Sequence, residues 1–396
     1  MLPDPDVKST RLRSLDAYRG FVMLAMASGG AGALAGLVDH GDGVSSQVLY
    51  WLRQQLDHVP WRGGVFWDMI QPSFMFMVGV AMPFSFASRT ARGETWTRMF
   101  GHALVRSMVL IALAVFLASN GSRYTHYSFV NVLGQIGLGY MFVFLLLGRG
   151  PAVQLAAAIA ILVADWLLFA LYPVAVSEFP FTKYGVSDPS ILMTGFFAHW
   201  NMNANVAAAF DGWFLNLFPQ PPGQPFVVNG GGYATLNFIP SMATLIFGVL
   251  AGGLLRSERD PMGKLRTLLL AGAVGVSLGL VLDASVCPIV KRIWTPSWTI
   301  YSAGYACWML AAFYAVIDIA GFRRWSFPLA VVGMNSIAIY LMAQLMKPFV
   351  ASTLRTHFGP EFFSGPYGPL IRAASTLLVF WLVCFWMYRQ KIFVKI

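Results

Sequence analysis

One segment of the chain joins a polar loop to an apolar run, and it carries the residue types best suited to chemistry. Asp57 to Ser85 reads DHVPWRGGVFWDMIQPSFMFMVGVAMPFS. His58 supplies an imidazole, the side chain that most readily moves a proton or an acyl group near neutral pH. Asp68 stands where the loop enters the apolar run. Its carboxylate could orient the imidazole or cap the following helix, and the two roles are compatible.

Further polar motifs lie within apolar parts of the chain. They are RLRSLDAYRG at Arg11 to Gly20, KRIWTPSW at Lys291 to Trp298 and FPLAVVGMNSIAIY at Phe327 to Tyr340. Together with the histidine segment, and in the same order, they resemble the motifs of the transmembrane acetyltransferase family typified by heparan-α-glucosaminide N-acetyltransferase. The chain begins almost at the first motif, so we expect a bacterial-type member that lacks the N-terminal luminal domain of the animal enzymes.

The resemblance implies a role for each motif. It implies acetyl-coenzyme A as co-substrate, a sugar or glycan as acceptor, and no metal. His58 and Asp68 are the expected catalytic residues. The residues expected to bind coenzyme A on the inner side are Asp16, Arg19, Asn335 and Ser336. The residues expected to bind the acceptor are Trp61, Gly63, Lys291, Trp294 and Ser297.

Structural roles compete with the expected coenzyme A contacts. Asp16 and Arg19 share one face of a helix and are able to form an ion pair at the membrane boundary. Asn335 and Ser336 are polar groups in an apolar run, where hydrogen bonds between helices are the usual explanation. Both explanations remain open beside the coenzyme A path.

Alternatives also exist for the residues expected near the acceptor. Lys291 could oppose Asp283, or it could line the site and meet an anionic group. Trp294 could belong to the aromatic belt at the membrane interface. Where the family tends to have asparagine between Trp61 and Gly63, this chain has Arg62. That difference concerns the choice of acceptor more than the fold.

Composition independently indicates a membrane protein. Of 396 residues, 57% are hydrophobic and only 11% are charged, against roughly 45–50% and 25% in soluble domains. The net charge of +10 comes from basic residues that stand singly or in pairs beside apolar spans, so a nucleic-acid partner is not expected. The cysteines number three and lack metal-ligand spacing.

Apolar windows of membrane length predict about ten transmembrane helices. Their residue ranges are 17–38, 68–88, 99–119, 128–147, 152–172, 237–255, 266–285, 297–318, 326–346 and 369–388. Placing both termini in the cytoplasm puts most of the 27 Lys and Arg residues inside, as the positive-inside rule favours. We therefore expect an integral protein of the bacterial inner membrane.

The outer side is then formed by two loops of a single transmembrane domain, residues 1–396. The reactive loop, 39–67, holds His58 and an apolar spacing from Ser45 to Leu56 that predicts a short interfacial helix. The long outer loop, 173–236, is rich in proline and glycine, which favour turns. It could be a lid that binds the acceptor or an ordinary connector.

The sequence thus predicts an acetyltransferase that moves an acetyl group from cytoplasmic acetyl-coenzyme A to a sugar amine or hydroxyl outside. Coenzyme A is charged and bulky, so its thioester must reach across the bilayer through a polar path enclosed by helices. A transporter or flippase and a noncatalytic membrane partner are the alternatives. N- or O-acetylation, direct transfer or an acetyl-histidine intermediate, and a homodimer all remain open.

Overall fold

The computed structural model describes residues 12–38, 43–174 and 179–394. Arg11 of the first motif, residues 39–42 of the reactive loop and residues 175–178 of the long outer loop lie outside the described residues. The described chain forms helices and loops without a strand, apart from an isolated bridge between Gly63 and Val290. The expected all-α fold is confirmed.

By length and composition, seven helices of the described chain could cross a membrane. They include α4 (Ile70–Ala91, preceded by the 3₁₀ turn η2, Phe66–Met69), α5 (Trp96–Ser119), α7 (Pro151–Ala170), α9 (Phe238–Arg256, preceded by η7, Thr235–Asn237), α10 (Pro261–Ser285), α11 (Pro296–Phe313, continued by the π-helix η9, Tyr314–Ile319) and α15 (Gly368–Arg389). The pair α12 (Phe327–Gly333) and α13 (Ser336–Leu345) makes eight if it forms one span. The chain is therefore an integral, polytopic membrane protein.

The remaining predicted spans are present as shorter helices. Residues 128–147 hold α6 (Val132–Phe144). Residues 17–38 hold α1 (Arg13–Ser28), the 3₁₀ turn η1 (Gly30–Ala33) and α2 (Ala35–Val38). The predicted single helix breaks because Gly29 has φ 97°, a left-handed conformation that glycine adopts easily and that ends a helix.

A second break lies inside the predicted span 326–346. Helices α12 and α13 are bent by 78° where Met334 and Asn335 interrupt the helix. The Asn335 amide donates to the carbonyl of Ile392 at 3.1 Å, and its oxygen accepts from the Val394 nitrogen at 3.1 Å. The side chain thus binds backbone groups near the C-terminus, and these contacts hold the bend.

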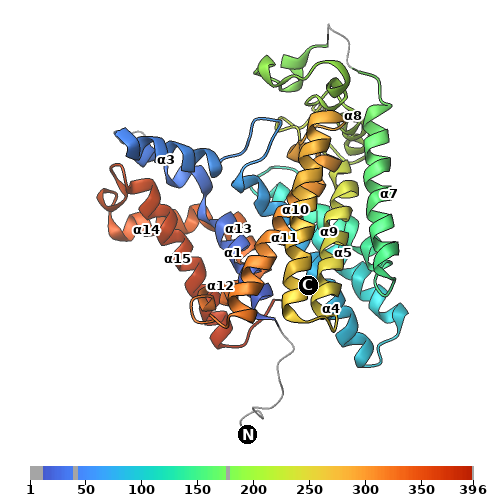
Figure 1. Ribbon diagram of the computed structural model, residues 1–396. Coiled ribbons are helices and arrows are strands. Elements are labelled where there is room, and N and C mark those ends of the chain that lie inside the picture. The colour runs from blue at the N-terminus through green and yellow to red at the C-terminus, as the bar shows by residue number, and fades with distance from the viewer. Residues whose placement is uncertain (1–11, 39–42, 175–178, 395–396) are drawn as a thin grey trace. The chain divides into compact units, whose positions relative to one another are not determined.

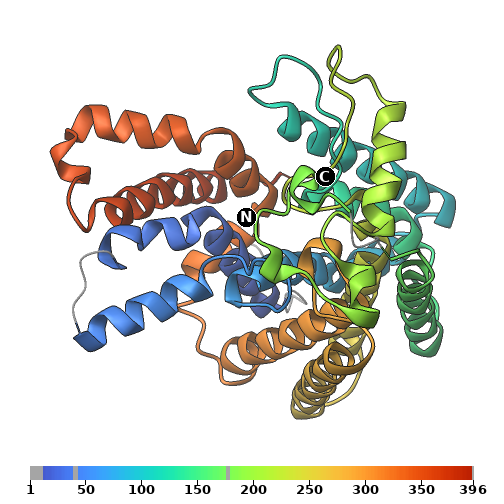
Figure 2. The same ribbon diagram turned by 90° about the horizontal axis from the view of Figure 1, so that it is seen from above.

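Interleaved segments of the chain form two compact units. The first draws on Met1–Leu49, Asp260–Leu269 and Trp308–Lys395, and the second on Tyr50–Arg259 and Leu270–Cys307. Within the first unit, α14 (Lys347–Phe358) runs alongside α15, as Figure 2 shows. Helix α3 (Gly43–Gln55) confirms the short helix expected before His58.

The second unit contains the long helices α4, α5, α7 and α9. Figure 1 shows the segment after α7 gathered at one end of these helices, around α8 (Val206–Phe214). We call residues 179–236 the outer segment, after the side of the membrane on which the sequence predicts them. As the turn-rich composition predicts, it consists mainly of short 3₁₀ turns and loops. It positions the loop that carries His58.

Helices α4 and α9 meet at backbone contact distance because glycines face one another. A Cβ added to Gly248 would collide with the Phe76 carbonyl oxygen, and one added to Gly79 would collide with the Leu245 carbonyl oxygen. Glycine at such positions is typical of helix pairs in membranes, where close approach maximises van der Waals contact. The pair anchors α4, which begins directly after Asp68.

We expect Gly248→Ala to destabilise the protein by about 1–3 kcal/mol, because the added methyl group meets rigid backbone. Thermal unfolding in detergent should show a midpoint lower by several degrees. Gly253→Ala is the matched control on the same helix, since its added Cβ meets no atom within 4 Å. Equal midpoints for the two variants would contradict the close packing.

Candidate active site

His58 lies in a cluster with Asp68 and Lys291, all within the second unit. The imidazole Nδ1 is 2.6 Å from Asp68 Oδ1 and 3.1 Å from Lys291 Nζ. Lys291 Nζ is also 3.2 Å from Asp68 Oδ1. The Asp68 and Lys291 side chains are almost fully buried, whereas that of His58 is 37% exposed. The cluster therefore presents the imidazole, and not the ion pair behind it, to the surroundings.

The Asp68 carboxylate accepts hydrogen bonds on both oxygens. Its Oδ2 faces the backbone nitrogens of Val65 at 3.3 Å and Val59 at 3.4 Å. The contact with Val65 lies in the turn η2, so Asp68 satisfies an amide at the start of the helix as well as holding His58. Asp68 therefore both caps the turn η2 and contacts the His58 ring, two roles that the sequence allowed together.

The contact with a carboxylate fixes which imidazole nitrogen is free. With Asp68 ionised, Nδ1–H of His58 donates to Oδ1, and the other nitrogen, Nε2, carries a lone pair. Nε2 makes no hydrogen bond to any of the described residues. An exposed, oriented and unbonded imidazole nitrogen is able to accept a proton or attack an acyl carbon.

Lys291 belongs to this cluster and not to Asp283. Burial lowers the pKa of Lys291, the neighbouring Asp68 carboxylate acts in the opposite direction, and Arg292 adds to the lowering. Asp283 instead pairs with Arg62, whose Nε lies 3.0 Å from its Oδ1. Of the two alternatives for Lys291, opposition to Asp283 is therefore wrong.

Backbone contacts bring the histidine loop to the Lys291 segment. Gly63, with φ 104°, donates its nitrogen to the Ile289 carbonyl at 2.8 Å. Arg292 donates to the Val59 carbonyl at 3.4 Å and to the Gly231 carbonyl at 3.0 Å. Arg292 thus ties the loop, the outer segment and the KRIWTPSW motif together, a function that sequence reasoning missed.

The loop is also anchored by a buried indole. Trp61 is 1% exposed, and its Nε1 donates to the Trp200 carbonyl at 3.0 Å. A Cβ on Gly232 would lie 2.6 Å from the Trp61 ring, so this glycine allows the outer segment to pack on the indole. The outer segment is therefore at least a structural support for the reactive loop.

Other residues expected at the acceptor make scaffold contacts. Trp294 is buried, adopts φ 51° and donates its indole N–H to Thr244 at 3.3 Å. Ser297 is also buried and donates to the Pro288 carbonyl at 2.7 Å. These contacts hold the Lys291 segment in shape, while direct contact of Trp61, Gly63, Trp294 and Ser297 with an acceptor stays a prediction.

The residues expected to bind coenzyme A lie in the first unit. Asp16 is buried, and a Cβ on Gly333 would collide with its carbonyl oxygen, so α1 and α12 touch there. Asn335 is fully buried and its amide is engaged by the backbone contacts described above, whereas Ser336 is half-buried. The roles of Asp16, Arg19, Asn335 and Ser336 in coenzyme A binding stay predictions.

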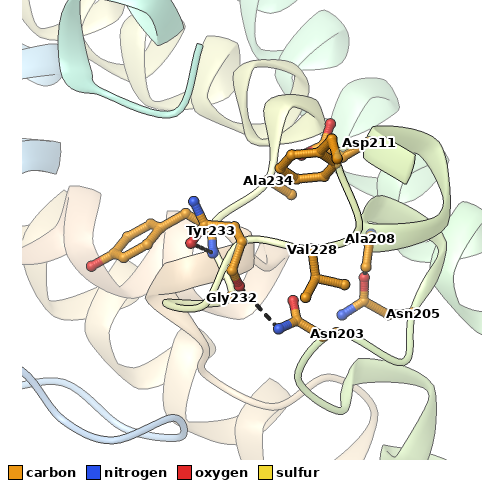
Figure 3. A pocket seen from close by; sticks show the side chains of 10 residues that line it. Asn203, Asn205, Ala208, Asp211, Val228, Gly232, Tyr233 and Ala234 are labelled. Carbon is orange, nitrogen blue, oxygen red and sulfur yellow. Dashed lines mark hydrogen bonds between the residues drawn. The ribbon is translucent and has the colours of Figure 1, made fainter. Parts of the chain in front are cut away.

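Asparagines organise the outer segment. Asn203 donates to the carbonyls of Tyr184 at 2.7 Å and Asn229 at 3.0 Å, and Asn205 caps α8 through Ala207 and Ala208. Figure 3 shows Asn203, Asn205 and Asp211 around the resulting pocket. The pocket is too narrow to admit a water molecule. Its polar side chains instead hold neighbouring parts of the outer segment together.

No group of three or more His, Cys, Asp or Glu side chains within residues 12–38, 43–174 and 179–394 is placed to hold a metal ion.

Proteins of known activity have sequences similar to that of this chain. The chain is 23% identical over 426 residues to heparan-alpha-glucosaminide N-acetyltransferase of Homo sapiens, and 23% identical over 431 residues to that of Mus musculus. Each match covers 98% of this chain, which spans 60% and 61% of those relatives. No protein-family model matches. The resemblance of the motifs is confirmed as a distant relationship.

Asp211 makes the stability of the outer segment depend on pH. Burial raises its pKa to about 6, against the hydrogen bond from the Thr235 nitrogen, which lowers it. A carboxyl that ionises near pH 4 when unfolded and near 6 when folded binds more protons in the folded state, so stability should fall as pH rises between these values.

We expect the thermal midpoint of Asp211→Asn, measured relative to the unchanged protein, to rise from pH 4 to pH 6.5. Across this pH range the free energy of unfolding of the variant should rise by about 2–3 kcal/mol relative to the unchanged protein, since one pKa unit is about 1.4 kcal/mol. Asp188→Asn is the control, because that exposed carboxyl has a lowered pKa. A constant difference for Asp211→Asn across this range would contradict the buried, protonated state.

Proposed function

From the distant relationship to these N-acetyltransferases, we propose that the protein transfers an acetyl group from acetyl-coenzyme A to an amine or hydroxyl of a sugar across a membrane. The observation that carries the proposal is the partly exposed imidazole of His58, with Nε2 unbonded, beside the buried pair of Asp68 and Lys291. Such a base matches the need of acyl transfer, in which the attacking group must lose a proton as the carbon–oxygen or carbon–nitrogen bond forms.

In direct transfer, His58 Nε2 takes the proton from the acceptor as its nitrogen or oxygen attacks the acetyl carbonyl carbon. The tetrahedral intermediate then expels the coenzyme A thiolate, and His58 returns the proton to that sulfur. The Asp68 carboxylate, 2.6 Å from Nδ1, stabilises the imidazolium that exists between these steps. Lys291 keeps the carboxylate paired while the imidazole is neutral.

The covalent route uses the same nitrogen as the nucleophile. Nε2 attacks the thioester carbonyl carbon and the coenzyme A thiolate leaves. The acceptor then attacks the acetyl-imidazole, Nε2 leaves, and the proton released by the acceptor balances the one that the thiolate takes up. The two routes differ in one observable, because only the covalent route exchanges labelled coenzyme A into acetyl-coenzyme A without an acceptor. The proposed coenzyme A path, with Asp16, Arg19, Asn335 and Ser336 along it, rests on the motif resemblance.

We expect His58→Ala to lose acetyl transfer by about 10²-fold or more, because loss of a general base commonly costs that much. Thermal stabilisation by acetyl-coenzyme A should persist, since a ligand that binds the folded state raises its stability. Release of labelled coenzyme A with a panel of amino sugars provides the assay, and His126→Ala, at an exposed loop residue, is the control. Near-normal turnover by His58→Ala would contradict both routes through His58.

Lys291→Met should lower the thermal midpoint in detergent by several degrees, because it leaves the buried Asp68 carboxylate without its lysine partner. Lys291→Arg keeps the charge and should lower the midpoint less. Equal midpoints for the two variants would show that the charge of Lys291 does not stabilise the site.

The proposed sidedness places both termini in the cytoplasm and the outer segment on the opposite side, which the distribution of Lys and Arg supports. Reporter fusions at the C-terminus and after Gly223, an exposed turn residue of the outer segment, should therefore report opposite compartments. Matching signals would contradict this orientation, whatever the chemistry at His58.

A further inference from the structure

A cleft of about 500 Å³ opens beside the reactive loop. Its wall is formed by Pro60, Trp61 and Arg62 of that loop and by Ser190–Thr194 and Phe197 of the outer segment. We call it the outer cleft. Its volume falls within the range of about 300–1,000 Å³ that is typical of small-molecule sites. The loop that lines it also carries His58, two residues before Pro60.

Arg62 is held in one orientation at the edge of this cleft. Its Nε donates to Asp283 Oδ1 at 3.0 Å and its Nη2 donates to Asp283 Oδ2 at 3.0 Å. Nη2 also donates to the Asp283 backbone carbonyl at 2.9 Å. This two-bond fork is the most specific geometry that an arginine makes with a carboxylate. Asp283 Oδ1 accepts from the Ile289 nitrogen at 2.7 Å as well, so the carboxylate itself is fixed.

The guanidinium is also stacked against an aromatic ring. Its central carbon lies 5.3 Å from the centroid of Phe197, which places the outer segment against the reactive loop. The remaining nitrogen, Nη1, has no hydrogen-bond partner among the described residues, and the Arg62 side chain is 41% exposed. A fixed donor with free N–H groups therefore stands next to a phenyl face.

This combination selects a class of ligand. Asp283 neutralises the charge of Arg62, so the pair offers directional N–H donors without a strong net field. A ring that carries many hydroxyl groups can accept from such donors and lay its C–H face on an apolar wall. A ligand with several negative charges would find no unpaired cation in this wall, and a protonated amine would find no unpaired carboxylate there.

We propose that the outer cleft binds an uncharged sugar ring of the acceptor, and that Arg62 and Phe197 determine this specificity. The inference rests on the proposed acetyl transfer to a sugar, and it names the substrate class and the residues that recognise it. Of the residues predicted from the sequence to bind the acceptor, the cleft includes Trp61 but not Gly63, Lys291, Trp294 or Ser297, and it adds Arg62 and Phe197.

The test measures sugar binding without catalysis. Saturation-transfer NMR on the purified full chain in detergent, with methyl α-glucoside as the probe and glucuronate as the charged comparator, should detect the uncharged sugar. Arg62→Ala and Phe197→Ala should each weaken its binding about tenfold, as loss of a hydrogen bond to a charged group or of an aromatic wall does. Phe197→Tyr should retain binding, and Arg123→Ala, at an exposed loop residue, is the matched control.

Each alternative result has a definite meaning. Undiminished binding in both Arg62→Ala and Phe197→Ala, with thermal midpoints close to that of the unchanged protein, overturns the proposal. Should Arg62→Ala not fold, Phe197→Ala alone decides. Preference for glucuronate that is lost in Arg62→Ala would make the cleft an anion site and would also overturn it.

The same measurement separates this inference from the proposed function. Binding is repeated in a His58→Ala background, where it should be unchanged because the cleft does not include the imidazole. Sugar binding that depends on Arg62, in a protein that transfers no acetyl group, would support the cleft and refute the enzyme. Acetyl transfer whose KM for the sugar is the same in both cleft variants would refute the cleft alone.

Discussion

The buried pair of Asp68 and Lys291 is the interaction on which the site depends. Removing either partner would leave an uncompensated charge in a dry environment, which commonly costs several kcal/mol. The pair therefore requires the start of α4 and the KRIWTPSW segment to stay docked. Gly63 and Arg292 join the same two parts of the chain through hydrogen bonds to the Ile289 and Val59 carbonyls, and Trp61 anchors the loop on the Trp200 carbonyl. His58 takes its orientation from Asp68.

Much of the fold could be predicted because bilayer length is a strong constraint on sequence. Every predicted span holds a helix, since an apolar run of that length has few other ways to satisfy its backbone. The breaks at Gly29 and Asn335 were missed because they depend on tertiary partners. Asn335 ends a helix by bonding Ile392 and Val394, far along the chain, which hydropathy does not encode.

The contacts of the candidate site could likewise be predicted only where the residues are close in sequence. His58 and Asp68 could be found because they belong to one short segment, and their contact is local in sequence. Lys291 comes 233 residues after His58, so its choice of Asp68 over Asp283 could not be read from spacing. The fork between Arg62 and Asp283 was missed for the same reason, although the unusual arginine was itself a signal.

The glycine contact between α4 and α9 has a consequence for the electrostatics of the proposed acetyl transfer. Asp68 lies in the turn that continues directly into α4, and α4 is fixed by backbone contact at Gly79 and Gly248. A carboxylate mounted on such a support cannot swing to follow a developing charge. The carboxylate is already in place before an imidazolium would form at His58. The site therefore needs less reorganisation energy than water would need around the same charge.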